Sequence, residues 1–176
     1  MITSGRESEQ GTLVAEGTVK PEWIDVNGHM NVAYYLLAFD QGVDALWTEV
    51  GITDEYIKTR KLSTFAVEAH ITYQQELHKG DLYRVTAQIL AIDNKRVHQF
   101  QRMYHAETGA LAATGEWLNL HINLETRRAC VWPDDILASF TAIAESQGST
   151  AVPPEMGKQM KLIAPTFALQ GYASDE

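Results

Sequence analysis

Cysteine and long apolar runs are both scarce in this chain of 176 residues. Its single cysteine, Cys130, excludes a disulfide within the chain and suits a reducing compartment. No run reaches the roughly 18 apolar residues that a membrane span requires. The first ten residues are polar and lack the apolar region of a signal peptide. We therefore expect a cytoplasmic protein that does not enter a membrane.

Basic residues are also few in this chain. The chain has 14 lysines and arginines against 23 aspartates and glutamates, a formal net charge of −9. This excess argues against general binding to nucleic acid or to an anionic membrane, although it leaves room for a local basic pocket for phosphate. The length fits one domain, and 45% apolar residues are enough for a core. We expect a disordered N-terminus over residues 1–10, a domain over 11–147 and a C-terminal arm over 148–176.

One long helix is the strongest local prediction. Asn31 is a good N-cap, and Gly51 suits the residue after the helix C-terminus. Between them the apolar residues follow one stripe of a helix of about five turns. The stripe consists of Val32, Tyr35, Leu36, Phe39, Val43, Leu46, Trp47 and Val50.

Strand patterns surround this helix. We expect strands at 12–19, 63–76, 82–92, 97–106 and 110–124, with further helices at 53–59 and 134–145. In the second strand, alternation places Phe65, Val67, Ala69, Ile71 and Tyr73 on one face. This order predicts an α+β fold, a five-stranded antiparallel sheet wrapped around one long central helix. Because such a sheet has two edges, we expect a homodimer or a dimer of dimers.

The sequence Asp25-Val26-Asn27-Gly28-His29-Met30-Asn31 places a carboxylate just before this helix. Backbone N–H groups at a helix N-terminus lack intrahelical partners and carry partial positive charge. A carboxylate beside such groups can attack a carbonyl carbon while the N–H groups hold the oxygen. We therefore predict that Asp25 is catalytic, as a nucleophile or as a base for water. The alternative is that Asp25 only caps or bends its loop.

The neighbours of Asp25 are candidates for supporting roles. Asn27 can hydrogen-bond the carboxylate or the attacking water, or can simply serve the turn. Gly28 has a backbone role, because glycine adopts angles that other residues resist. His29 is a candidate acid or base, but a structural role at the helix start is favoured. The N–H groups near Asn31 and Val32 are the candidate oxyanion site.

Three motifs resemble a known family. Asp25-x-x-Gly28-His29-Met30-Asn31-x-x-x-Tyr35 resembles the signature of hotdog-fold acyl-CoA thioesterases of the 4-hydroxybenzoyl-CoA thioesterase type. Ile71-Thr72-Tyr73 followed by Gly80-Asp81 resembles the second strand and turn of that family. Thr126-Arg127-Arg128 followed by Pro133 resembles the end of its last strand. The resemblance covers roughly residues 12–135 and implies that Asp25 is the catalytic carboxylate in hydrolysis of a short or small acyl-CoA.

A narrower resemblance concerns the acyl group. The segment from Glu22 to Tyr35 is similar to thioesterases of carnitine breakdown, which act on betainyl-CoA. A quaternary ammonium acyl group would be bound by aromatic rings and a carboxylate. The candidates for this pocket are Trp23, Tyr34, Tyr35 and Glu68. The alternatives are that the rings belong to the core and that Glu68 lies on a solvated or subunit-interface face.

Coenzyme A would also require basic contacts for its phosphates. Lys95 and Arg96 in a predicted turn, and Arg127 and Arg128 after the last strand, are the candidates, unless they are only solvated surface charges. The chain has no Gly-Lys-Ser/Thr phosphate loop and no Gly-x-Ser-x-Gly elbow. Its six histidines make no close metal-ligand pattern. We expect no metal and no cofactor, since coenzyme A is part of the substrate.

Two alternative functions remain open at this point. Hotdog acyl-CoA hydratases or dehydratases resemble the same region but carry Asp-x-Asn-Pro-x-His, with histidine five residues after aspartate. Here Gly28 replaces the proline and His29 follows Asp25 by four residues, so the pattern disfavours this lyase reading. The second alternative is a non-catalytic acyl-CoA-binding module.

Overall fold

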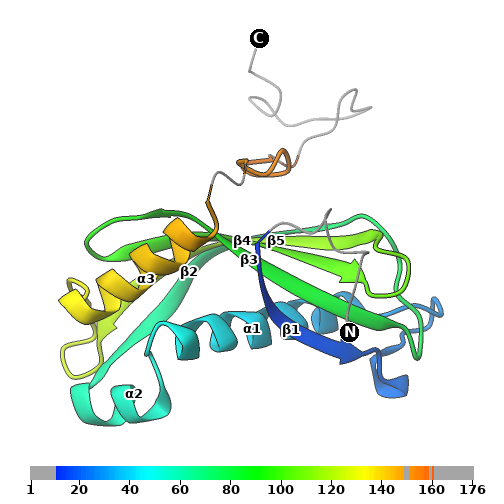
Figure 1. Ribbon diagram of the computed structural model, residues 1–176. Coiled ribbons are helices and arrows are strands. Elements are labelled where there is room, and N and C mark those ends of the chain that lie inside the picture. Colours follow the sequence, from blue (N-terminus) through cyan, green and yellow to red (C-terminus); the bar gives the residue numbers. More distant parts are fainter. Residues whose placement is uncertain (1–10, 149–150, 159, 161–176) are drawn as a thin grey trace, which may run out of the picture.

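The computed structural model describes residues 11–148, 151–158 and 160. The tail predicted over residues 1–10 lies outside the described residues. The fold is α+β: one antiparallel sheet curls around a long helix, α1 (Val32–Glu49), as Figure 1 shows. The strands are β1 (Thr12–Thr18), β2 (Leu62–Tyr73), β3 (Leu82–Ile92), β4 (Arg96–His105), β5 (Leu111–Asn123) and the short β6 (Arg128–Ala129). The remaining helices are η1 (Pro21–Trp23), α2 (Asp54–Arg60) and α3 (Asp134–Ser146).

The sheet order is β1-β3-β4-β5-β2, with β6 paired to the end of β5. The expected five strands are therefore confirmed, and only β6 was missed because it has two residues. This order makes β1 and β2 the two edge strands. In the described part of the chain, no helix is long and apolar enough to cross a membrane.

The start of α1 is fixed by its cap, as predicted. The Asn31 side chain accepts a hydrogen bond from the Ala33 amide at 3.0 Å. The predicted apolar stripe is only partly correct, because Val32 and Leu36 are 54% and 44% exposed. Ala38 and Gly42 are buried in their place. A Cβ at Gly42 would lie 3.0 Å from a Val14 methyl, so small residues let the helix approach the sheet closely.

A bulge corrects the predicted faces of β2. The register with β5 shifts between Ala66 and Glu68, so Val67 is the extra residue. Phe65 pairs with Leu120, whereas Ala69 and Ile71 pair with Trp117 and Gly115. The bulge reverses the alternation, so Phe65 does not share a face with Ala69 and Ile71 as predicted.

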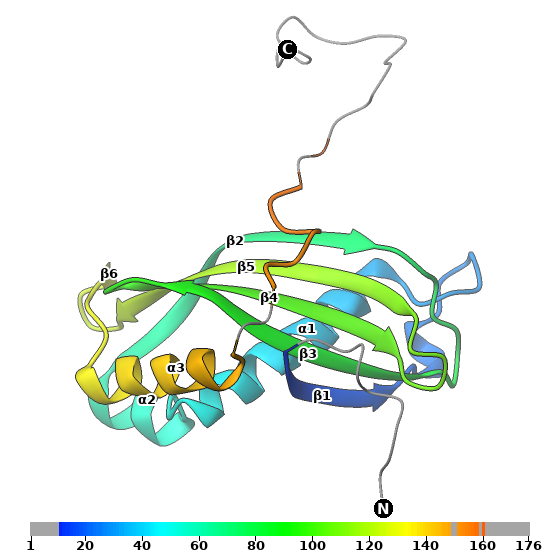
Figure 2. The same ribbon diagram turned by 45° about the horizontal axis from the view of Figure 1, so that its top comes forward.

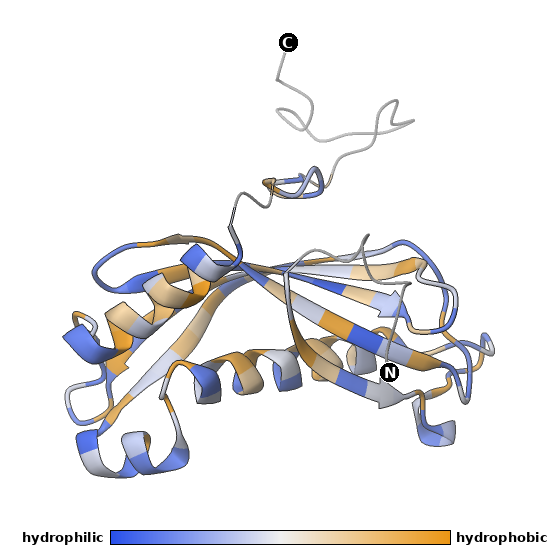
Figure 3. Ribbon diagram, viewed as in Figure 1, coloured by the Kyte–Doolittle hydropathy of each residue, from blue (hydrophilic) through white to orange (hydrophobic). Residues whose placement is uncertain are grey.

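The two faces of the sheet are covered differently. On the inner face α1 packs closely, with the Gln101 side-chain amide between the Phe39 carbonyl at 3.0 Å and the Val43 amide at 3.3 Å. Apolar segments of α1 and of the strands face each other in Figure 3. At the far end of α1, Phe140 of α3 packs edge-on against Trp47. On the outer face lies the described part of the C-terminal arm that was predicted over residues 148–176 (Figure 2).

Candidate active site

Asp25 lies in a tight turn that ends at the first turn of α1. Ile24 and Met30 form an antiparallel bridge, and the Asp25 amide donates to the His29 carbonyl at 3.1 Å. Gly28 has a φ of +86°, which favours glycine and closes the turn, with its amide donating to the Asp25 carbonyl. The backbone amide of Asn27, rather than its side chain, donates to Asp25 Oδ1 at 2.8 Å. No described residue donates to Oδ2, which leaves that oxygen for a water or a substrate.

The first amides of α1 are not equally available. The Asn31 amide donates to the Trp23 carbonyl at 2.8 Å, and the Ala33 amide donates to the Asn31 side chain. The Asn31 amide is therefore occupied and cannot serve as the predicted oxyanion donor in this conformation. The Val32 amide, as the first of the helix, has no intrahelical acceptor. It is the remaining candidate for stabilising an oxyanion.

The bonds on either side of Asp25 explain how the turn is held. The Met30 amide donates to the Leu77 carbonyl at 2.7 Å, which ties the turn to the connection between β2 and β3. The Leu77 amide in turn donates to the Tyr35 hydroxyl at 3.0 Å, and Tyr35 is 3% exposed. Tyr35 thus acts as a positioning residue in this site.

We expect Tyr35→Phe to destabilise the protein without abolishing activity. The substitution would leave the buried Leu77 amide without its acceptor, a loss of about 1–3 kcal/mol in the free energy of unfolding. Urea denaturation measures the loss. Tyr73→Phe is the matched control, because the Tyr73 ring packs edge-on against Tyr35 while 49% of the residue is exposed. Equal stability of the two variants would contradict the positioning role.

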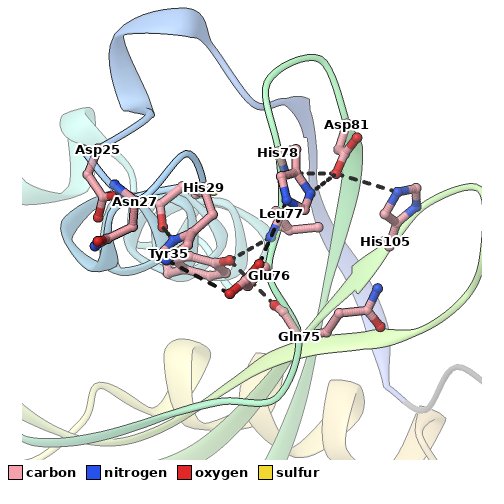
Figure 4. Close-up of polar contacts among 11 residues, drawn as sticks. Asp25, Asn27, His29, Tyr35, Gln75, Glu76, Leu77, His78, Asp81 and His105 are labelled. Carbon is pink, nitrogen blue, oxygen red and sulfur yellow. Dashed lines mark hydrogen bonds and ion pairs between the residues drawn. The ribbon is translucent and has the colours of Figure 1, made fainter.

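His29 is engaged away from the Asp25 carboxylate. Its Nδ1 lies 3.2 Å from the Met30 carbonyl oxygen, and its Nε2 lies 4.0 Å from Glu76. Figure 4 shows a chain of alternating histidines and carboxylates that continues from Glu76 through His78 and Asp81 to His105. These contacts fit the favoured structural role of His29.

Sequence reasoning missed this polar chain. It borders a cavity of about 500 Å³ lined by Gln75, Glu76, His78, Asp81, His105 and Thr108. In the sequence, Gly80-Asp81 was interpreted only as part of a strand and turn motif, with no polar site assigned to it. The contact with His105 could not be predicted, because it depends on the pairing of β3 with β4.

Only part of the predicted aromatic pocket comes together within one protomer. Trp23 and Tyr34 stack on each other with centroids 5.2 Å apart, and Trp23 is 6% exposed. Glu68 pairs with Leu118 on the outer face of the sheet, where it lines a cavity with His70, His98 and Glu116. The prediction that Glu68 joins these rings is therefore wrong for a single protomer, because the sheet lies between them.

The four basic residues predicted for phosphate do gather in one region. Lys95 and Arg96 lie at the turn before β4, and Arg127 and Arg128 lie at the turn before β6. The Lys95 carbonyl accepts from the His121 amide of β5 at 2.8 Å, which brings the two turns together. They lie at the end of the sheet that carries β6, opposite the Asp25 turn (Figure 2). Within one protomer they are therefore far from Asp25.

A second cleft lies between α1, α2 and β2. It holds about 330 Å³, and its walls include Asp40, Asp44, Asp54 and Trp47. None of the three aspartates makes an ion pair with a described basic residue. Burial, and then the like charges of Asp40 and Asp54, raise the pKa of the Asp44 carboxyl above its ordinary value. Such a cleft is suited to a cation. Among the described residues, no group of three histidine, cysteine or acidic side chains could hold a metal ion.

Comparisons with known proteins agree with this geometry. The model of the thioesterase-like superfamily matches residues 19–140. The betainyl-CoA thioesterase of Pseudomonas aeruginosa is 33% identical over 84% of this chain and 92% of its own length. The bifunctional L-carnitine dehydrogenase/betainyl-CoA thioesterase of Ruegeria pomeroyi is 36% identical over 86% of this chain, which spans only 31% of that protein.

A solved structure extends the comparison to the fold. A Staphylococcus aureus protein in complex with CoA superposes with a TM-score of 0.81 at 29% identity, covering 88% of this chain and 98% of that one. None of these relatives favours the hydratase alternative. The chain therefore belongs to the thioesterase-like superfamily and is an acyl-CoA thioesterase with the hotdog fold.

Proposed function

We propose that this acyl-CoA thioesterase hydrolyses a small cationic acyl-CoA, such as betainyl-CoA, with Asp25 as the catalytic carboxylate. The observation that carries the catalytic assignment is the turn that holds Asp25 beside the start of α1. Asp25 would attack the thioester carbon directly or activate a water, and the Val32 amide would stabilise the developing oxyanion. The reaction would need no metal or other cofactor, and we propose the cytoplasm as its location.

The active unit we propose is a homodimer formed by the β2 edges. β2 is a long edge strand, and it exposes Phe65, Val67 and Tyr73. Exposed apolar residues on a free edge favour pairing with a second copy. A twofold axis would pair β2 antiparallel with itself and continue the sheet, so that both α1 helices lie antiparallel on the same face.

This dimer would complete each site. Asp44 lies twelve residues beyond Val32, about 18 Å along α1, too far to reach the same thioester. In an antiparallel pair of helices, the start of one α1 lies beside the second half of the other. The acidic cleft of one protomer would then receive the cationic acyl group at Asp25 of the second. Trp47 in the cleft would add a cation–π contribution.

The same arrangement gives a role to the basic residues. The end of the sheet that carries Lys95, Arg96, Arg127 and Arg128 would move next to Asp25 of the second copy. We propose that these side chains contact the phosphates of coenzyme A. Arg128 and Lys95 are the better candidates, because Arg96 pairs with Asp93 at 2.6 Å and Arg127 lies over the Phe65 ring.

Two substrates of equal shape test the proposed acyl group. Betainyl-CoA and 3,3-dimethylbutanoyl-CoA differ only in that a quaternary nitrogen replaces a quaternary carbon. We expect kcat/KM, measured by release of free CoA thiol, to be about tenfold or more higher for betainyl-CoA than for 3,3-dimethylbutanoyl-CoA. Equal rates, or a preference for the neutral ester, would reject the cationic substrate while leaving the thioesterase assignment intact.

We expect Val67→Lys to shift the dimer toward monomers. A charge placed on the paired edge would oppose its symmetric copy, so the dissociation constant should rise about tenfold or more, as measured by analytical ultracentrifugation. Activity at low protein concentration should fall with it, because each site would lose the cleft of its partner. Leu13→Lys is the control, since Leu13 lies exposed on β1, the other edge strand. An unchanged dimer in Val67→Lys would contradict pairing through β2.

A further inference from the structure

The described part of the C-terminal arm crosses the outer face of the sheet from one strand to the next. Its first contact is with β3, where the Gln88 side chain donates to the Ala151 carbonyl at 3.2 Å. The next is with β4, where Arg102 pairs with Glu155 at 3.5 Å. The third is with β5, where Glu116 accepts from the Gly157 amide at 2.8 Å. The path therefore leads through the sheet order toward the free edge of β2, as Figure 2 shows.

These contacts attach the described part of the arm to the sheet. Arg102 is 5% exposed, and the Glu155 carboxylate of the arm balances its buried charge. Pro153, within the arm, is itself buried. Glu116 is bound on both carboxylate oxygens, by the Gly157 amide and by His98 Nε2 at 2.9 Å. The arm thus brings Gly157 and Lys158 to a defined place on the outer face.

That place is the middle of β2. Lys158 and Met160 line one cavity of about 510 Å³ together with Glu68, Ala69 and His70. Lys158 and Glu68 are both exposed, and neither makes an ion pair with a described residue. The cavity thus holds an unpaired cation and an unpaired anion at the strand edge where the second copy is proposed to bind.

We propose that the arm is a strap between protomers, in which Lys158 of one copy pairs with Glu68 of the second copy. This inference rests on the proposed β2 dimer. Pairing centred on the middle of β2 would bring the two Glu68 side chains about 5 Å apart across neighbouring strands. Like charges opposite each other destabilise a strand pair. The two Lys158 side chains, one from each arm, offset this repulsion across the interface.

A charge exchange tests the strap. Lys158→Glu and Glu68→Lys should each raise the dissociation constant of the dimer about tenfold, because each change affects two symmetric contacts. The double variant should return to within about threefold of the natural protein. Analytical ultracentrifugation measures the constant, and circular dichroism confirms that each variant is folded. Lys79→Glu is the control, since Lys79 lies in the exposed turn between β2 and β3.

The outcomes separate the two proposals. A natural protein that is monomeric at all concentrations overturns the dimer and the strap with it. The strap alone is overturned if the protein dimerises but each single variant has the same dissociation constant as Lys79→Glu. It is also overturned if the loss of dimer stability in the double variant equals the sum of the two single losses. Rescue by the double variant supports it. Thioester hydrolysis by the dimeric fraction should be unchanged in every case, because the arm lies on the face opposite α1.

Discussion

Asp25→Asn should lower kcat for thioester hydrolysis by about 10²- to 10⁴-fold, the range expected when a catalytic carboxylate is removed. The substitution keeps the shape of the side chain, and an asparagine Oδ1 can still accept the Asn27 amide that binds Asp25 Oδ1 at 2.8 Å. The turn and its bridge between Ile24 and Met30 should therefore persist. What is lost is the charge and nucleophilicity of the carboxylate. KM should change little, because Asp25 acts on the reacting carbon.

The control for this variant lies in the same loop. Glu22→Gln removes an exposed carboxylate from η1, three residues earlier, and should leave the rate near that of the natural protein. Release of CoA thiol and thermal unfolding should be measured on the same preparations. A folded Asp25→Asn variant with a rate close to that of Glu22→Gln would show that Asp25 only shapes its turn.

Asp44→Asn should remove the preference for a cationic acyl group. The Asp44 carboxyl faces the like charges of Asp40 and Asp54 with no described basic partner, so a bound cation would relieve their repulsion. A loss of about tenfold or more in kcat/KM for betainyl-CoA corresponds to about 1.4 kcal/mol, within the range of a partly solvated charge contact. For 3,3-dimethylbutanoyl-CoA, kcat/KM should stay constant or rise.

Glu49→Gln provides the matched carboxylate for this test. Glu49 is exposed in the last turn of α1 and does not line the acidic cleft. Its removal changes the net charge of the protein by the same amount as Asp44→Asn. If kcat/KM falls by the same factor in both variants and for both thioesters, the effect comes from overall charge. The cleft then has no part in selecting the acyl group.

The two experiments examine different parts of the site. The Asp25→Asn variant tests the chemical step. The Asp44→Asn variant tests the choice of acyl group and also the contribution of the second copy, because Asp44 would reach the substrate only across the dimer. A protein that fails the second test but passes the first is a thioesterase for an uncharged acyl group. The exposed Val32 and Leu36 beside the start of α1 would then suit an apolar acyl chain.

The sequence by itself determined the features that depend on short distances along the chain. Asn31 predicts the start of α1 because its side chain caps an amide two residues away. Gly28 and Asp25 predict the turn for a similar local reason, and alternating strand patterns predict the antiparallel sheet. These local patterns were sufficient for the fold class and for naming Asp25 as the candidate catalytic residue.

Only the tertiary structure decided which side chains share a surface. The bulge at Val67 depends on the register between β2 and β5, and the exposure of Val32 and Leu36 depends on which face of α1 meets the sheet. Packing of distant segments likewise decided two further contacts. It separated Glu68 from the aromatic rings, and it brought Asp44 and Asp54 together in one cleft. Residue spacing gives no information about such contacts, since each is set by the position of another element and, at the β2 edge, by a second chain.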